Sequence, residues 1–146
     1  HLYVQTLMSE YKRVRYEDEN FEQFHERVLK LYTPAAIGFI MKLGAYLREK
    51  NIDAEIGFSE KVHTGRNEEF ELFEIGRKLY YKLGAKEPYS AYERFTNVLK
   101  NEKLEDIREL NAAVDENLAL LCEKILDSKE SRRAVVFSEV EEFITL

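Results

Sequence analysis

The sequence contains few residues of the kinds that cross-link a chain, interrupt its helices or hold it in a membrane. Its 146 residues include one cysteine, two prolines, six glycines and no tryptophan. The single cysteine, Cys122, has no disulfide partner within the chain and is typical of a reducing compartment, so we expect a cytoplasmic protein. No apolar run approaches the roughly 20 residues of a membrane-spanning helix, and we therefore expect no membrane partner.

Positive charge is also in deficit. The chain has 22 lysines and arginines against 28 acidic residues, which gives a formal net charge of −6. This balance disfavours a broad electrostatic contact with nucleic acid, whereas a narrow or metal-mediated contact stays open. Apolar residues make up 45% of the chain and charged residues 34%, a mixture too apolar for a disordered protein. The length fits one folded domain.

One segment, residues 34–47, has apolar residues on every side of a helix and a single charge, Lys42. Thr33 and Pro34 form a strong helix start, because the hydroxyl caps the first turn and the proline lacks an N–H that would have no partner there. A helix that is apolar all round is normally buried at the centre of a fold. We therefore predict that 34–47 is the central helix.

Helical spacing dominates the rest of the chain. Apolar residues recur at intervals of three and four in 2–15, 20–31, 67–84 and 104–125. We expect Asn20, in a capping box with Gln23, and Asn67 to cap two of these helices. We also expect Gly84 to end one helix, Asn101 to begin a long helix that continues to about 126, and shorter helices to cover 90–99 and 138–144. Nothing in the sequence separates two domains. The predicted fold is therefore an all-α, single-domain helical bundle over 1–146.

Two short runs, 52–58 and 134–137, have the apolar patterning of strands. They are too short and too far apart for a sheet-based fold. Whether they pair as a small ribbon stays open, and we treat 52–66 as a connection between helices.

Carboxylates are the abundant chemical groups. Glu71 and Glu74 are three residues apart within one expected helix, and Asp106 and Glu109 repeat this spacing in another. Each pair would lie on one side of its helix. Four oxygen ligands from two packed helices suit Mg²⁺, which would activate a water for phosphodiester hydrolysis. The alternative is a solvated helix surface, because cationic residues lie close to both pairs.

Other kinds of site fit the sequence less well. His25, His63 and Cys122 give only three ligands for a structural zinc ion, without paired spacing. Cys122 lies on the apolar side of its expected helix, where a small buried residue is typical. No glycine-rich phosphate-binding loop follows a strand.

Three segments occur in the order found in ribonuclease III-type domains and resemble them. Segment 33–47 resembles the central apolar helix of that family, 66–84 its following helix, and 104–113 its second acidic motif, with Asp106 and Glu109 three apart. The resemblance covers about 32–116. It implies a compact, archaeal-type helical endonuclease domain that forms a homodimer, holds Mg²⁺ through acidic residues and acts on double-stranded RNA.

The family's first acidic motif aligns in two ways. In one alignment, Lys42 stands where the family has an aspartate. In the other, Glu71 and Glu74 match the two glutamates of the motif, and Lys78 takes the place of the aspartate. Either alignment puts a lysine at a metal-ligand position, where its charge would repel Mg²⁺.

Lys42 needs an explanation in its own right, because it interrupts the apolar helix. It would have to extend to solvent, pair with a carboxylate or lie at a dimer interface. We prefer a pairing with Asp106 or Glu109, which would turn the expected metal site into a structural salt bridge.

Two functions follow from these observations. The first is a ribonuclease III-like endonuclease or binder of structured RNA, with Asp106, Glu109, Glu71 and Glu74 as catalytic residues and Mg²⁺ ligands. Basic residues expected to contact the RNA backbone are Lys12, Arg13, Arg15, Arg132 and Arg133.

The second function is a non-catalytic helical dimerisation or protein-interaction module. It accounts for the lysine at a ligand position and for the acidic net charge. Several tyrosines surround Pro88, and tyrosine is frequent both at interfaces and at the rim of a core. These tyrosines are Tyr80, Tyr81, Tyr89 and Tyr92.

Overall fold

The structure is a computed structural model that describes residues 5, 7–8, 10–12, 15–56, 67–89 and 103–146. Its elements are α2 (Phe21–Leu31), α3 (Pro34–Glu49), α4 (Glu68–Gly84), α6 (Ile107–Leu110), α7 (Glu116–Leu126) and the 3₁₀ turns η1 (Phe137–Glu139) and η2 (Glu141–Ile144). Further helical positions occur among the described residues of 5–12. The described part of the chain contains no β-strand, so the all-α prediction is confirmed.

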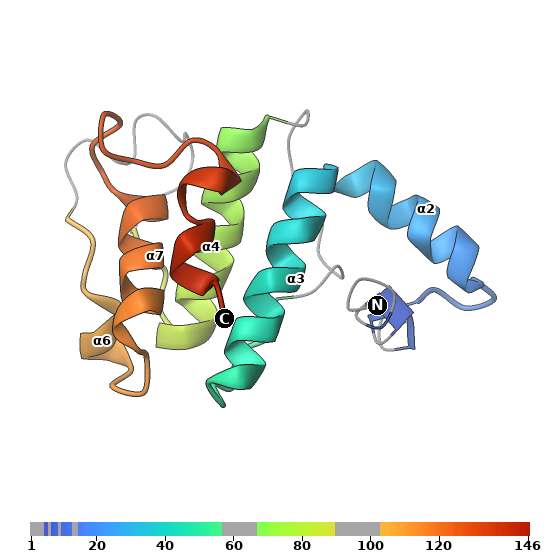
Figure 1. Cartoon of the computed structure of the whole chain (residues 1–146), viewed down its shortest axis with the longest axis horizontal. Helices are drawn as coiled ribbons and strands as arrows, with labels where there is room; N and C mark the ends of the chain where they lie inside the picture. The colour runs from blue at the N-terminus through green and yellow to red at the C-terminus, as the bar shows by residue number, and fades with distance from the viewer. Residues whose placement is uncertain (1–4, 6, 9, 13–14, 57–66, 90–102) are drawn as a thin grey trace.

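The predicted central helix is α3, which lies between α2 on one side and α4 with α7 on the other (Figure 1). Its first turn is capped as expected, because the Thr33 hydroxyl accepts a hydrogen bond from the Ala36 N–H at 3.2 Å and Pro34 occupies the first position. Eight of its 16 residues are buried. Pro34, Ala35 and Lys42 are exposed, so the helix buries a broad face rather than its whole circumference.

Helices α4 and α7 pack tightly against each other at Gly76. A Cβ atom at this position would lie 2.3 Å from Ile125 Cγ2, well inside van der Waals contact. Glycine therefore makes this helix packing possible. Leu79 of α4 and Leu118 and Leu121 of α7 are fully buried, and each such side chain contributes about 1.5–3 kcal/mol.

The long helix predicted over 101–126 is interrupted. Among its described residues, 111–115 separate α6 from α7. The side-chain amide of Asn111 donates to the Leu83 carbonyl at 2.9 Å, and its side-chain oxygen accepts from the Ala113 N–H at 3.0 Å. The bond to Ala113 is local and competes with the helix for a backbone partner, and the bond to Leu83 holds the Asn111 side chain against the end of α4. The apolar spacing agrees with the residues that are buried, but the prediction of one continuous helix is wrong.

Helix α4 ends at Gly84, as predicted. The residue that takes the left-handed conformation is the next one, Ala85, with φ 54°. A Cβ on Gly84 would lie 2.9 Å from side-chain atoms of both Ile107 and Leu110. Glycine here makes room for α6.

Neither strand-like run forms a strand where the structure describes it. In 52–56, Ile56 is buried while Asp53 and Glu55 are exposed, so the alternation reflects one covered side. The run 134–137 leads into η1, and the Phe137 ring lies 4.9 Å from the ring of Phe39. The helix expected over 138–144 forms as the two short turns η1 and η2. Residues 57–58 and the helix expected over 90–99 lie outside the described residues.

The segment before α3 is α2, which lies on the side of α3 away from α4 (Figure 1). It begins with the expected capping box, in which Asn20 and Gln23 exchange two hydrogen bonds of 2.9 Å. In the described residues, no single helix has the length and apolar character needed to cross a membrane. Only α2 and α3 taken together, across a bend of 108°, meet that test of length and composition.

Candidate functional site

Glu71 connects α4 to the start of α3. Its side chain is buried, with 2% exposed, and one oxygen accepts from the Thr33 hydroxyl at 2.7 Å while the other accepts from the Thr33 N–H at 3.1 Å. Because the same hydroxyl caps α3, the carboxylate completes a hydrogen-bonded chain across the two helices. Hydrogen bonds to a charged acceptor are stronger than neutral ones. Glu71 therefore has a structural role in which both oxygens are used.

Glu74 pairs with Arg77 on the same helix, at 3.0 Å. The guanidinium also contacts Glu87 at 3.1 Å, so Arg77 joins α4 to the segment that follows it. Partial burial works against the charged form of Arg77, but the two carboxylates outweigh it and raise the pKa of the guanidinium. Glu74 thus belongs to an ion-pair cluster on the surface of α4.

Asp106 and Glu109 lie at α6. Asp106 is the N-cap of this short helix and accepts from the Arg108 N–H at 3.0 Å, whereas Glu109 is exposed. Both line a cavity of about 460 Å³ between α6 and α7. Three more carboxylates line the same cavity, those of Glu105, Glu123 and Asp127.

The four predicted metal ligands do not form one group. Neither Glu71 nor Glu74 lines the α6–α7 cavity. Within the parts of the chain that the structure describes, which include all four, no three or more His, Cys, Asp or Glu side chains are placed to hold a metal ion. Glu71 holds the start of α3, and Glu74 takes part in an ion pair on α4. Asp106 and Glu109 lie at α6 instead.

Lys42 does not pair with Asp106 or Glu109, so our preferred pairing is wrong. Its amine lies 3.3 Å from a Glu141 oxygen in η2. The turn η2 packs beside α3 and supplies this nearer carboxylate. Both side chains are well exposed, and such a pair contributes at most about 1 kcal/mol.

Most of the basic residues expected to contact RNA make contacts within the chain. Arg133 is buried and donates to the Asp127 carbonyl at 3.1 Å. Arg132 pairs with the Asp127 carboxylate at 3.2 Å, and Arg15 donates to the Glu19 carbonyl. Lys12 is exposed, and Arg13 lies outside the described residues.

The tyrosines near Pro88 divide into two kinds. Tyr80 and Tyr89 are buried, and their hydroxyls donate to the carbonyls of Glu105 (2.6 Å) and Leu126. Burial raises the pKa of Tyr80 to about 12. Tyr81, in contrast, has 51% of its surface exposed. Tyr92 lies outside the described residues.

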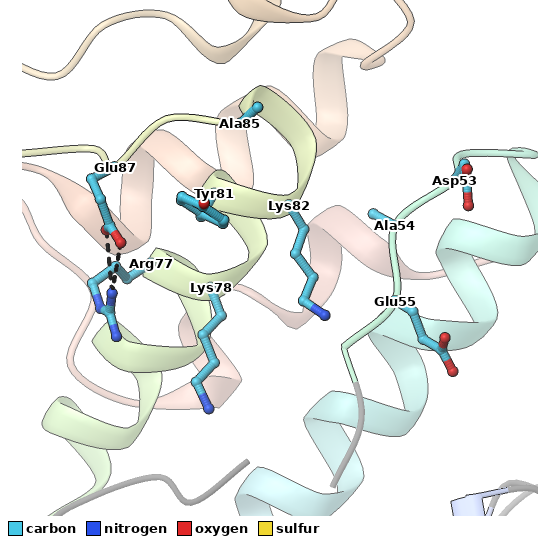
Figure 2. A pocket seen from close by; sticks show the side chains of 9 residues that line it. All are labelled: Asp53, Ala54, Glu55, Arg77, Lys78, Tyr81, Lys82, Ala85 and Glu87. Atoms are coloured by element: carbon cyan, nitrogen blue, oxygen red, sulfur yellow. Dashed lines mark hydrogen bonds and ion pairs between the residues drawn. The ribbon is translucent and has the colours of Figure 1, made fainter. Parts of the chain in front are cut away.

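A second cavity was not foreseen from the sequence. It is a groove of about 670 Å³ between α4 and the segment 53–55 (Figure 2), which we call the α4 groove. Its lining residues come from two separate parts of the chain. They are Asp53, Ala54, Glu55, Arg77, Lys78, Tyr81, Lys82, Ala85 and Glu87.

The two walls of the α4 groove differ in charge. Figure 2 shows Lys82 extending from α4 toward segment 53–55, and Lys78 extending from the preceding turn of α4. The carboxylates of Asp53 and Glu55 lie on the other side of that segment, away from α4. The groove can therefore offer ammonium groups next to the exposed ring of Tyr81. The spacing of Lys78, Tyr81 and Lys82 on one helix face was visible in the sequence, but the opposite wall was not.

Comparisons with models of known families, with curated proteins and with solved structures give no match for this chain. The likeness to ribonuclease III-type domains therefore remains a resemblance of motifs. The function has to be argued from the residues and geometry of this chain.

Proposed function

We propose that this chain is a non-catalytic helical module that binds a protein partner through the α4 groove. The observation that carries the proposal is Tyr81, whose side chain is half exposed on the wall of a groove of about 670 Å³. Tyrosine is enriched at protein interfaces because its ring supplies apolar contact and its hydroxyl supplies a hydrogen bond.

The roles of the acidic residues support the same proposal. A metal ligand needs an oxygen that is available to the ion. Glu71 uses both oxygens on Thr33, and Asp106 caps α6. Moving the Glu71 carboxylate onto an ion would release the helix start that it now holds, and one oxygen of Asp106 is already used by the Arg108 N–H. We therefore assign these two acids to the scaffold.

A ribonuclease III-like, Mg²⁺-dependent endonuclease or RNA-binding domain is the second candidate. The observation in its favour is the α6–α7 cavity, where Asp106 and Glu109 lie with other carboxylates. A homodimer is compatible with both candidate functions. Sedimentation velocity measures the oligomeric state of the chain.

The two functions differ in their response to metal and RNA. We expect duplex RNA to stay intact when it is incubated with the purified chain and Mg²⁺. We also expect calorimetric titration with Mn²⁺ to give no saturable heat. If the wild-type chain cleaves the duplex or binds Mn²⁺ saturably, the endonuclease replaces the interaction module.

Asp106 allows a matched pair of variants for this test. Asparagine is as good an N-cap as aspartate but carries no charge, whereas alanine removes the cap at a cost of about 0.5–2 kcal/mol. We expect Asp106→Asn to melt like the wild type and Asp106→Ala to melt at a lower temperature. Cleavage that is lost in Asp106→Asn, at unchanged melting temperature, would show a catalytic carboxylate.

A further inference from the structure

The α4 groove also indicates the chemistry of its partner. We propose that it binds an acidic segment of another polypeptide, with a partner carboxylate on Lys82 and an apolar partner side chain on Tyr81. This inference rests on the proposed function, because it assumes that the groove is the binding surface. It adds the class of ligand.

Lys82 carries the charge argument. In the described part of the chain, the ammonium group of Lys82 makes no hydrogen bond or ion pair, and the residue is exposed. The neighbouring cations differ, because Arg77 contacts Glu74 and Glu87, and Lys86 contacts Glu105 at 2.6 Å. The positive charge of Lys82 is thus available to a partner at the groove.

Lys78 adds a second ammonium group on the same side. It lies one turn before Lys82, and both residues line the groove in Figure 2. Lys78 already has an interaction within the chain, so only Lys82 is assigned to a partner carboxylate. Tyr81 lies beside them with half of its surface exposed. The wall of α4 therefore combines charge with apolar area.

The opposite wall limits what kind of anion can enter. Asp53 and Glu55 line both the α4 groove and a smaller cavity of about 240 Å³ beside α3. In Figure 2 their carboxylates face away from the lysines, and both residues form the edge of the groove. Duplex RNA carries a dense, regular row of phosphates, and such a rod would bring some of them against these carboxylates. A single side-chain carboxylate of a peptide can reach Lys82 individually. Charge complementarity therefore favours an acidic peptide.

The test uses four labelled probes in fluorescence anisotropy. The first is a short peptide in which glutamate alternates with leucine and phenylalanine. Two matched peptides carry glutamine or lysine in place of glutamate, and the fourth probe is a short RNA duplex. We expect saturable binding of the acidic peptide alone, and weaker binding as salt screens the charges.

Variants of the groove then locate the binding. We expect Lys82→Glu to weaken the acidic peptide by about tenfold and to gain affinity for the lysine peptide. Tyr81→Ala should weaken the acidic peptide by about fivefold or more. Lys124→Glu is the matched control, because it makes the same change of charge at an exposed position of α7 outside the groove. We expect it to leave the affinity unchanged.

Several results would overturn the inference. They are equal binding of all three peptides, no binding of any peptide, preferential binding of the RNA duplex, and an acidic-peptide affinity that Lys82→Glu does not change. Self-association that Lys82→Glu abolishes would assign the groove to a second copy of the chain. If the peptide tests fail while the RNA stays intact and Mn²⁺ does not bind, only the proposal of an acidic ligand is refuted. RNA cleavage refutes the proposed function as well.

Discussion

The two faces of α4 carry similar residue types and have opposite roles. Tyr80 is fully buried and its hydroxyl is bonded to the Glu105 carbonyl, whereas Tyr81, the next residue, is half exposed in the α4 groove. Glu71 on the inner face uses both oxygens to hold α3. Lys82 on the outer face contacts none of the described residues through an ion pair. The position around the helix, rather than the residue type, separates the scaffold from the candidate binding surface.

The largest effect should distinguish the two faces directly. Leu79→Ala removes a fully buried side chain, and we expect a loss of about 2–5 kcal/mol in the free energy of unfolding. Tyr81→Ala, two residues later, should change it by no more than about 0.5 kcal/mol, as is usual for a surface substitution. Urea unfolding measures both values. Comparable losses in the two variants would show that the outer face is also part of the scaffold.

The next effect concerns the carboxylate of the inner face. Glu71→Gln replaces one acceptor oxygen with an NH₂ group that faces a donor of Thr33, and we expect a loss of about 1–3 kcal/mol. Glu74→Gln is the control, because it breaks only a partly exposed ion pair and should cost about 0–1 kcal/mol. Thermal melting measures both. An equal cost for the two substitutions would contradict the structural role of Glu71.

The glycines of α3 and α4 give a matched pair of effects of opposite sign, the larger of which is similar in size to that of Glu71→Gln. Gly76→Ala puts a methyl group against Ile125, and we expect a loss of about 1–3 kcal/mol from overpacking. At Gly38 nothing lies within 4 Å of an added Cβ, so Gly38→Ala should gain about 0.5–1 kcal/mol from helix propensity. Denaturant unfolding of both variants tests the packing of α4 on α7. A gain at both sites would show that the two helices do not meet at Gly76.

The last effect is absent at neutral pH and concerns the stability of the fold in alkali, where two buried groups titrate. Burial raises the pKa of the Cys122 thiol and of the Tyr80 hydroxyl to about 12 each, from ordinary values of 9.0 and 10.0. The folded state therefore holds these protons more tightly than the unfolded state. Their contribution to stability is complete below about pH 9 and is lost as the pH rises from there toward 12. Unfolding free energies measured across this range should fall, and a constant value would contradict the burial of these groups.

Local signals predicted the starts of α2, α3 and α4. The caps at Asn20, Thr33 and Asn67 were all expected, and each forms with a side-chain oxygen that accepts from an N–H three residues later. These bonds depend on residues that are neighbours in the sequence. For this reason the element types could be predicted over most of the described chain.

Contacts between distant residues could not be predicted in the same way. Asn111 interrupts the expected long helix because its amide reaches Leu83, 28 residues earlier. Glu71 bonds to Thr33 across 38 residues. An apolar period and an acidic spacing carry no information about which distant backbone group a side chain will meet. The same limit hid the α4 groove, because its second wall is the segment 53–55.

The most direct test of the account is paramagnetic broadening of the amide resonances of the isotope-labelled chain by Mn²⁺. We assign Glu71, Glu74 and Asp106 to scaffold contacts, and Glu109 lies at the surface. We therefore expect no saturable broadening centred on these four residues. Saturable broadening that converges on all four and is reversed by a chelator would contradict this assignment, because the acids would then form one metal site.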